Sequence, residues 1–570
     1  MQTSHFTKRQ FLPETIDLTD TAQLAPVFDK LTAQLDQAAT VADLEAWLRH
    51  HSEVCAALAE SSSLTYIQMT CQTDDEAKEK AYMHIVEVVD PWLKPRQFAL
   101  MQKLAQSPLF PQLPPFYEVY RRSVETQVKI YREENVARET QVAKLTQQYQ
   151  KISGGMTVQF DGQEQTLARM GRIQEEPDRP RREAAWKTVV ARRLQDAEKL
   201  EELFDQLLVL RNEIAHAAGF SDFRAYTFAS YERFDYTPDD CLRFHDAIER
   251  HVVPLARELQ EERRRKLGLD KLRPWDLAVD PDHNPPLHPF DKSSELLEKC
   301  HQIFGRLDPR LGEYYHVLRA QELVDLDNRK GKAPGGYQST LSEARVPFIF
   351  MNAVGVHRDV ETMLHEAGHA FHALAARDLP LHAYRSAPIE FCEVASMGME
   401  LLAAPHLRAF YSDKDAKRAQ RDHLEGIIKF FPWMATVDAF QHWIYTHPGH
   451  TRAERTAFWL SLMDRFGGTE DWSGFEPARG SMWHRQLHIF EIPFYYVEYG
   501  IAQLGALQLW QASRRDLPAA LDHYLKGLSL GGSRPLPELF QTSGLAFDFT
   551  DKTIAPLMRN VKDALLELAA

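Results

Sequence analysis

Apolar side chains recur at helical spacing over most of the chain, and residues that break helices are few. From about residue 24 to 149 they follow the period of amphipathic helices, with one interruption by prolines between 111 and 115. The segment 131–152 is typical of a long polar helix. We expect it to end at the Gly-Gly pair that follows, because glycine favours a helix stop. The pattern predicts a mostly α protein.

Two segments depart from the helical pattern. Residues 156–160 alternate apolar and polar side chains, an Asp-Gly pair follows, and residues 163–167 can return as a second strand. Asp-Gly between two such runs is typical of a β-hairpin. The apolar run 346–352 predicts a further strand, and a long helix is expected to begin near Val360. We therefore expect a small sheet beside that helix.

Length, charge and cysteine content narrow the class of protein. The 570 residues exceed one ordinary core, so two lobes or one large elaborated domain are expected. The net charge of -14 argues against nucleic acid as a partner. Five cysteines without a CxxC pair argue against a disulfide framework. The first residues form no apolar signal core and no run of about 18 apolar residues occurs. We expect a cytoplasmic protein with no membrane partner.

One pentapeptide carries candidate metal chemistry. Residues 365–369 read HEAGH, which is the motif HExxH within an apolar helical segment. His365 and His369 are four residues apart, so both imidazoles lie on one helix face and can bind one zinc ion. Glu366 projects beside them without filling a ligand position. We expect it to act as the general base on a metal-bound water.

A catalytic zinc ion usually needs a third protein ligand. The pattern HExxHxxGxxH fails because position 375 is alanine. His372 lies on roughly the same helix face, but three ligands from one straight helix rarely close a tetrahedron, so we expect it to pack or to support a ligand. The other source is the apolar segment 389–400, where glutamates are costly to bury without a partner. Helical spacing leaves Glu390 and Glu393 both open.

The chain resembles the thimet oligopeptidase and oligoendopeptidase F family of zinc metallopeptidases in five stretches. These are GKAPGGY (331–337), PFIFMN (347–352), HEAGHAFH (365–372), FCEVAS (391–396) and HIFEIPFYYVEYG (488–500). The resemblance implies a helical, two-lobed, clam-like zincin with a deep substrate channel and a small β-sheet near the active site. It also implies an N-terminal helical lobe with a small hairpin over 1–177 and a catalytic domain over 178–570.

The resemblance assigns the remaining metal ligand. In this family the glutamate of an F-x-E-x-x-S segment is the third zinc ligand, which implies Glu393 here. An acidic residue one turn before the first motif histidine supports a ligand histidine, which implies that role for Glu361.

The resemblance also implies which groups stabilise the reaction intermediate. His488, Tyr496 and Tyr499 are expected to donate hydrogen bonds to the oxyanion of the tetrahedral intermediate, with Tyr495 as a substitute for Tyr496. Thimet-type members carry another tyrosine where this chain has Ile492.

The function expected from these residues is that of a zinc metalloendopeptidase, an oligoendopeptidase that hydrolyses internal bonds of short unfolded peptides with one zinc ion per chain. The strand 348–352 is expected to pair with the substrate backbone, and the loop 335–337 to cover the site. Two alternatives stay open: a metallocarboxypeptidase or dipeptidase on the same scaffold, and a non-catalytic peptide-binding protein. Cleavage of a peptide blocked at both ends would exclude the first.

Overall fold

A computed structural model describes residues 6–569, and its internal contacts divide the chain into two compact units. Unit 1 contains the described residues up to Val128, together with Leu287–Gln420 and Ile501–Phe547. Unit 2 contains Lys129–Pro286, Arg421–Gly500 and the described residues from Asp548 onward. Each unit is therefore assembled from separated stretches. The domain boundary expected between residues 177 and 178 divides the chain into two continuous parts, and it stays a prediction.

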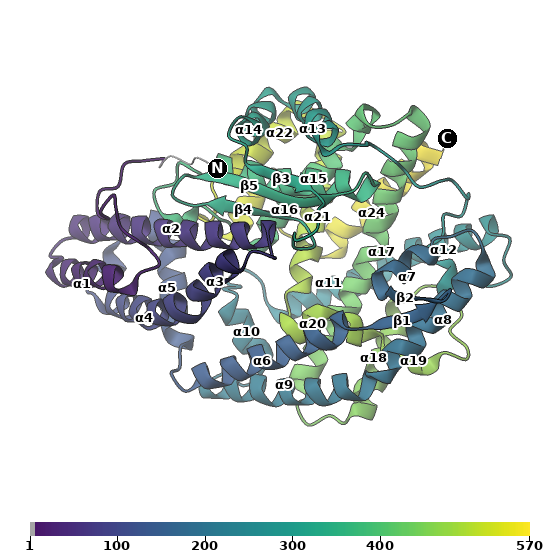
Figure 1. Ribbon diagram of the computed structural model, residues 1–570, viewed down its shortest axis with the longest axis horizontal. Helices are drawn as coiled ribbons and strands as arrows, with labels where there is room; N and C mark the ends of the chain where they lie inside the picture. Colours follow the sequence, from purple (N-terminus) through teal and green to yellow (C-terminus); the bar gives the residue numbers. More distant parts are fainter. Residues whose placement is uncertain (1–5, 570) are drawn as a thin grey trace. The chain divides into compact units, whose positions relative to one another are not determined.

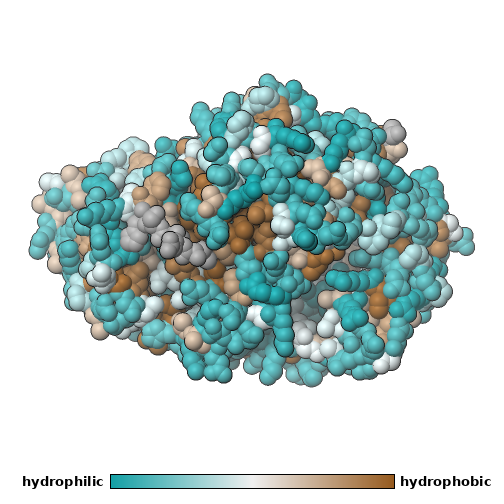
Figure 2. Space-filling model, turned by 45° about the horizontal axis from the view of Figure 1, so that its top comes forward, coloured by the Kyte–Doolittle hydropathy of each residue, from teal (hydrophilic) through white to brown (hydrophobic). Residues whose placement is uncertain are grey.

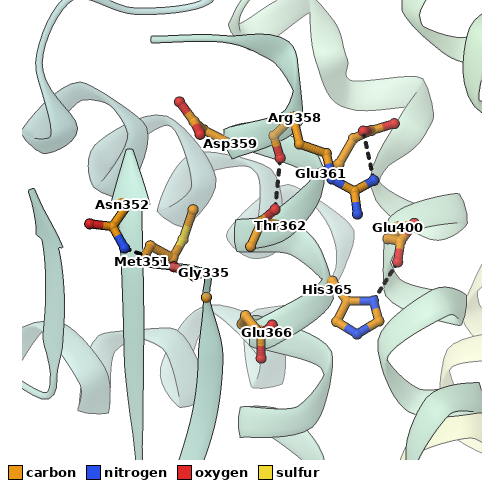
Figure 3. Close-up of a pocket in the computed structure, with 11 residues that line it drawn as sticks. Gly335, Met351, Asn352, Arg358, Asp359, Glu361, Thr362, His365, Glu366 and Glu400 are labelled. Carbon is orange, nitrogen blue, oxygen red and sulfur yellow. Dashed lines mark hydrogen bonds and ion pairs between the residues drawn. The ribbon is translucent and has the colours of Figure 1, made fainter. Parts of the chain in front are cut away.

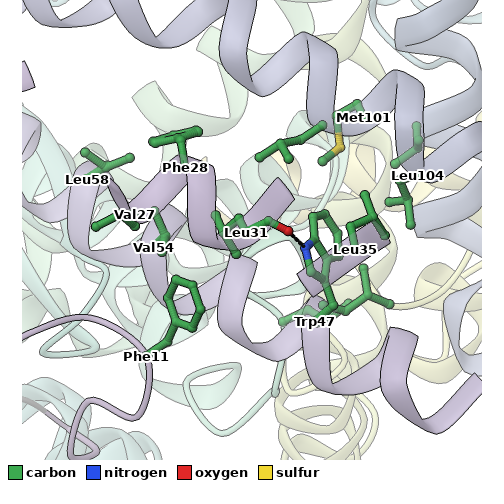
Figure 4. Close-up of a cluster of buried hydrophobic side chains, with 14 of the residues drawn as sticks. Phe11, Val27, Phe28, Leu31, Leu35, Trp47, Val54, Leu58, Met101 and Leu104 are labelled. Carbon is green, nitrogen blue, oxygen red and sulfur yellow. Dashed lines mark hydrogen bonds between the residues drawn. The ribbon is translucent and has the colours of Figure 1, made fainter. Parts of the chain in front are cut away.

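The N-terminal part of unit 1 is a helical layer with its own apolar core. Its helices are α1 (Thr21–Gln37), α2 (Val41–Cys71), α3 (Glu76–His84), α4 (Asp90–Gln106) and α5 (Glu118–Ile130). Figure 4 shows the core between them, where the Trp47 indole N–H donates to the carbonyl of Leu31 at 2.8 Å. A capping box between Thr40 and Asp43 fixes the start of α2.

A buried carboxylate joins this helical layer to the sheet of unit 1. Glu60 of α2 accepts hydrogen bonds from the backbone N–H groups of Glu343 and Ala344, each at 2.7 Å, in the turn between two strands. Arg9 donates to the Glu343 side chain at 2.6 Å. These contacts of Glu60 and Arg9 satisfy polar groups of the sheet that would otherwise be buried without partners.

The sheet of unit 1 has three strands in the order β3-β5-β4 (Figure 1). β3 (Val324–Asp327) runs parallel to β5 (Val346–Ala353), and β4 (Tyr337–Leu341) runs antiparallel to it. Because β5 is central, Ile349 and Phe350 already have Cα partners on both sides. The expected pairing of this strand with substrate is therefore wrong at these two residues, and β3 and β4 are the edge strands of the described sheet.

Helices cover the sheet of unit 1 and form the rest of its core. α15 (His357–Ala375) packs on β4 and β5, and α16 (Ile389–Ala403) packs on α15. The contact between these two helices is close at Gly368, where an added Cβ would lie 2.5 Å from the carbonyl oxygen of Ala395. The other helices are α13 (Ser293–Leu307), α14 (Pro309–Ala320), α22 (Leu517–Leu528) and α23 (Leu536–Thr542).

Unit 2 is helical apart from the hairpin expected from the Asp-Gly pair. β1 (Thr157–Phe160) and β2 (Gln163–Thr166) pair antiparallel around Asp161 and Gly162, both with positive φ. Its helices are α6 (Asn135–Gly154), α7 (Leu167–Ile173), α8 (Arg179–Gln195), α9 (Ala197–Ala217), α10 (Phe223–Ser230), α11 (Pro238–His251), α12 (Val253–Lys266), α18 (Arg452–Phe466), α19 (Glu476–Gly480), α20 (Leu487–Glu491) and α24 (Asp551–Ala569).

α5 begins in unit 1 and ends at Ile130 in unit 2, and two further helices also cross a boundary between the units. α17 (Asp413–Thr446) begins in unit 1 and ends in unit 2, whereas α21 (Tyr496–Ser513) begins in unit 2 and ends in unit 1. The mostly helical class with a small sheet is thus confirmed. Among residues 6–569, no helix is both long and apolar enough to span a membrane. Hydrophilic residues cover most of the face drawn in Figure 2.

Candidate metal centre and active site

Two neighbouring helices of unit 1 bring three candidate ligands together. α15 presents His365 and His369, with ring centroids 4.9 Å apart, and α16 presents Glu393. The Oε2 atom of Glu393 lies 3.3 Å from Nε2 of His365 and 3.7 Å from Nε2 of His369. In a tetrahedral zinc site, neighbouring nitrogen and oxygen ligands are about 3.3 Å apart. Between Glu390 and Glu393, the structure brings Glu393 to the histidines.

A second carboxylate of α16 orients the first histidine. The Oε1 atom of Glu400 lies 2.6 Å from Nδ1 of His365, on the ring edge opposite Glu393 (Figure 3). Glu361 lies 3.7 Å from His357 and 3.5 Å from Arg358, and the support expected from it for a ligand histidine stays a prediction. Glu361 lies one turn before His365 on α15, but the carboxylate that contacts Nδ1 of the His365 ring comes from α16.

The electrostatics of this group favour a positive charge at its centre. Burial lowers the pKa of His365, but hydrogen bonds to Glu393 and Glu400 outweigh it and leave that pKa well above its usual value. Burial raises the pKa of Glu393, yet the neighbouring histidines lower it overall. Glu393 also accepts a hydrogen bond from the Ser396 hydroxyl at 2.9 Å. His365 and Glu393 therefore form part of a candidate cation-binding group.

Glu366 follows His365 on α15, and both residues line one pocket. Its side chain is almost fully buried, at 8% exposure, and burial raises its pKa to about 7. His365 and a hydrogen bond from the backbone N–H of Gln338 act in the opposite direction. The pocket measures about 450 Å³, and Figure 3 shows Glu366 pointing into it beside β4 and β5.

The start of α15 is fixed by a carboxylate that also lines the pocket. One oxygen of Asp359 accepts hydrogen bonds from the N–H groups of Val354, Gly355 and Val356 at 2.8–3.0 Å. These bonds satisfy the loop that leads into the helix. α15 therefore begins at His357, three residues before the expected position, and the motif occupies its third and fourth turns.

His372 faces the interior and takes no part in the ligand group. It is buried, its ring lies 6.1 Å from that of Phe391, and burial lowers its pKa to about 3. It is thus held as a neutral, packed side chain, which matches the expectation for this position.

The residues expected to contact the oxyanion gather in unit 2. The ring of His488 lies 4.7 Å from that of Tyr496, 6.0 Å from that of Tyr499 and 6.2 Å from that of Tyr495. Burial raises the pKa of Tyr496 to about 12, so its hydroxyl keeps its proton. These residues start α21 or precede it, whereas the HExxH motif belongs to unit 1. Their roles stay predictions.

A chain of hydrogen bonds sets the proton position on His488. The indole N–H of Trp433 donates to Oε1 of Gln486 at 2.9 Å, and Nε2 of Gln486 lies 2.7 Å from Nδ1 of His488. An amide nitrogen only donates, so Nδ1 accepts and the proton lies on Nε2. Burial lowers the pKa of His488 to about 4. The ring is therefore a neutral N–H donor at neutral pH.

Family models match both parts of the chain. The model described as peptidase family M3 matches residues 172–558, and the model described as the peptidase M3 N-terminal domain matches residues 11–131. The chain belongs to peptidase family M3. This confirms the family that the five sequence stretches suggested. The ligand helices α15 and α16, and the cluster around His488, all fall within the matched region of this M3 peptidase.

Known proteins similar to this M3 peptidase have oligopeptidase names. The structure of PZ peptidase A with an inhibitor is 30% identical, with a TM-score of 0.87, over 98% of this chain and 99% of that chain. A structure named oligoendopeptidase F is also 30% identical, with a TM-score of 0.87, over 99% and 100%. The group B oligopeptidase PepB of Streptococcus agalactiae is 23% identical over 50% of this chain and 47% of its own length. The matched region spans about half the length of the curated relatives.

The structure adds residues to the M3 peptidase site that sequence reasoning missed. Glu400 follows Glu393 by seven residues, two helical turns, so both carboxylates face α15. That spacing could have identified Glu400. Nothing in the local sequence around Trp433 signals its link to His488, since 55 residues separate the two and only tertiary packing brings them together.

Proposed function

We propose that this M3 peptidase is a zinc-dependent endopeptidase that cleaves internal bonds of short, unfolded peptides. The observation that carries the proposal is the convergence of His365, His369 and Glu393, next to a pocket that His365 and Glu366 line. An extended peptide can enter such a pocket one residue at a time, so the substrate does not need to be folded.

The donor set fits zinc. Two imidazole nitrogens and one carboxylate oxygen lie within 4.8 Å of one another, and catalytic zinc sites commonly have three protein ligands of these types. Glu400 at Nδ1 of His365 is the outer partner that such ligands usually have. When bound, a zinc ion supplies Lewis acidity that polarises a carbonyl group and lowers the pKa of a water molecule.

Glu366 performs the proton transfers. Its carboxylate accepts a proton from the attacking water and passes it to the amine of the leaving peptide. Burial holds its pKa near the pH at which a base is both deprotonated and basic enough to react. His488, Tyr496 and Tyr499 donate hydrogen bonds to the oxyanion, a role supported by the Nε2 proton that Gln486 fixes on His488.

The substrate lies in an extended conformation beside β4. β4 pairs with β5 along one edge, and the Gln338 N–H on this strand reaches the Glu366 carboxylate. Pairing with the other edge of β4 positions a peptide by its main chain and therefore tolerates many side chains. Gly335 and Gly336, which line the pocket, precede this edge and leave room for the peptide.

A digest of peptides blocked at both ends tests the endopeptidase proposal. Acetylated and amidated peptides of varied length are incubated with the zinc-loaded chain, and the products are read by mass spectrometry. Internal cuts are expected. Cleavage of only the unblocked versions would indicate a carboxypeptidase or dipeptidase. Binding of these peptides without any cleavage would indicate a non-catalytic protein.

A further inference from the structure

Unit 2 contains a second group of potential metal ligands, far from the HExxH motif in sequence. α11 carries Cys241 and His245, and α17 carries Asp438 and His442. Each pair is four residues apart, so each lies on one helix face, the same spacing that joins two ligands in HExxH. All four side chains are buried, with Asp438 at 0% exposure.

The potential ligand atoms of this second group lie close together, as those of His365, His369 and Glu393 do. Nε2 of His442 lies 3.2 Å from Oδ2 of Asp438. The sulfur of Cys241 and one ligand atom each of Asp438 and His442 all lie within 4.8 Å of one another. A tetrahedral zinc site with one sulfur and two lighter ligands has ligand separations of about 3.3–3.6 Å.

Two polar atoms in this group lack hydrogen bonds that their burial would demand. Oδ1 of Asp438 and Nε2 of His442 have no hydrogen-bond partner among the described residues. The His442 nitrogen is near the carboxylate but is not aimed at it as a donor would be. A buried carboxylate with an unsatisfied oxygen is costly, and a bound cation would remove that cost.

We propose that Cys241, Asp438 and His442 bind a second zinc ion, which stabilises unit 2 and takes no part in hydrolysis. Thiolate, imidazole and carboxylate are all zinc ligands, and the two negative charges balance the ion. Nε2 of His245 lies 2.8 Å from Oδ2 of Asp438 and donates to it, which orients the carboxylate for binding.

Aromatic rings pack against the histidine of this site. The ring of His442 packs edge-on against Phe228 and Phe494, with centroids 6.1 and 5.3 Å away. Arg224 lies on the outer side, its Nη1 3.5 Å from Nδ1 of His442. A histidine that binds zinc through Nε2 carries its proton on Nδ1, so zinc binding would require the loss of this hydrogen bond from the half-buried Arg224.

The ion would also stabilise the segment ahead of α21. Gln441, next to His442 on α17, accepts a hydrogen bond from the backbone N–H of Phe494 at 2.8 Å. Phe494 has a positive φ of 66° and leads into Tyr496. Fixing α17 to α11 therefore fixes a strained turn beside the proposed oxyanion donors.

Cobalt substitution tests this proposal separately from the proposed function. The full chain is stripped of metal and loaded with Co²⁺ alone, and its near-ultraviolet spectrum is recorded. A thiolate ligand gives an intense sulfur-to-cobalt charge-transfer band, whereas the His365, His369 and Glu393 group contains no sulfur. The band is expected in the wild type, in His365→Ala and in Cys300→Ser, which removes another buried thiol. Cys241→Ser is expected to lose it.

Zinc content provides the second measurement. Elemental determination is expected to give two zinc ions per wild-type chain, and one in either His365→Ala or Cys241→Ser. A wild-type protein without the cobalt band would overturn the proposal, even if Cys241→Ser failed to fold. Equal zinc content in wild type and folded Cys241→Ser would overturn it as well. Loss of zinc from the HExxH site alone would leave the band in place and contradict only the proposed function.

Discussion

Glu366 is the side chain on which turnover depends most directly. Replacing its carboxylate by an amide in Glu366→Gln keeps the size of the side chain but removes the proton acceptor. We expect kcat to fall by about 10²–10⁴-fold, the usual contribution of a general base, while zinc content stays the same. Turnover of a blocked peptide and zinc content, measured on one preparation, check this. A variant with undiminished kcat would show that another group accepts the proton.

The pKa of Glu366 predicts the direction of the pH dependence. Burial raises it to about 7 in the absence of metal, and a nearby cation stabilises the carboxylate and lowers it. The base works only when deprotonated, so kcat/KM is expected to rise with pH, with a midpoint at or below about 7. A pH–rate profile with zinc content measured at each pH checks this. Activity that increases on acidification would contradict the assignment.

Glu400 and Glu361 form a matched pair for testing how His365 is oriented. Glu400 hydrogen-bonds to His365, whereas Glu361 pairs with His357 and Arg358, so Glu400→Gln is expected to weaken zinc binding by about 10–100-fold. Glu361→Gln removes the same charge from the neighbouring helix and should leave zinc affinity close to that of the wild type. Competition with a chromogenic chelator measures both. Equal losses would indicate a general charge effect rather than a specific contact.

At the scale of single residues, the sequence predicted those site residues whose relative positions are set by one helix. His365, Glu366 and His369 needed only a period of 3.6 residues, so their grouping could be predicted from spacing. Glu393 required the resemblance, because spacing within α16 did not say which glutamate faces α15. The contact of Glu400 with His365 was not predicted, because only the packing of two helices brings that carboxylate to the ring.

At the scale of elements, the contact between α15 and α16 depends on Gly368. A Cβ at this position would lie 2.5 Å from the Ala395 carbonyl oxygen and 2.6 Å from Cα of Ser396, so Gly368→Ala must push the helices apart. We expect a loss of about 1–3 kcal/mol in the free energy of unfolding and weaker zinc binding. Denaturant unfolding and chelator competition check both.

Gly426→Ala is the matched control for that substitution. Gly426 lies in α17, and nothing would lie within 4 Å of an added Cβ. This variant is expected to be at least as stable as the wild type, since alanine favours helix over glycine. If both alanine variants behaved alike, helix propensity rather than the α15–α16 contact would explain the result.

Helices and the hairpin were predictable as elements, but the order of strands was not. The run 346–352 is apolar and was recognised as a strand, yet its central place follows from pairing with β3 and β4. β4 has the sequence YQSTL, which is too polar to stand out. The expected contact between substrate and residues 348–352 failed at Ile349 and Phe350 for this reason.

At the scale of the whole molecule, metal binding is expected to contribute to stability. An ion that binds only the folded chain adds about 4.1 kcal/mol to the free energy of unfolding when it is present at 1,000 times its Kd. Dialysis against a chelator should therefore lower both Tm and peptide turnover, and added zinc should restore both. Calorimetry and the peptide assay check this. A chelator that changed neither would argue against bound zinc in the native protein.

The compact units could not be predicted from the sequence, because neither is continuous. The boundary between Pro286 and Leu287 falls in a proline-rich segment, but no change of composition marks the boundaries that lie inside helices. The boundaries near residues 420 and 500 fall inside α17 and α21, where periodicity indicates only an unbroken helix. The cytoplasmic location and the substrate channel also stay predictions.

The carboxylate of Glu60 limits how far this enzyme can be shortened. A truncated gene product that began near residue 172, where the main family match starts, would lack the acceptor for the two N–H groups between β4 and β5. The strand beside which substrate is proposed to lie would then end in an unsupported turn. The first hundred or so residues are thus part of the catalytic scaffold, and a minimal peptidase has to keep them.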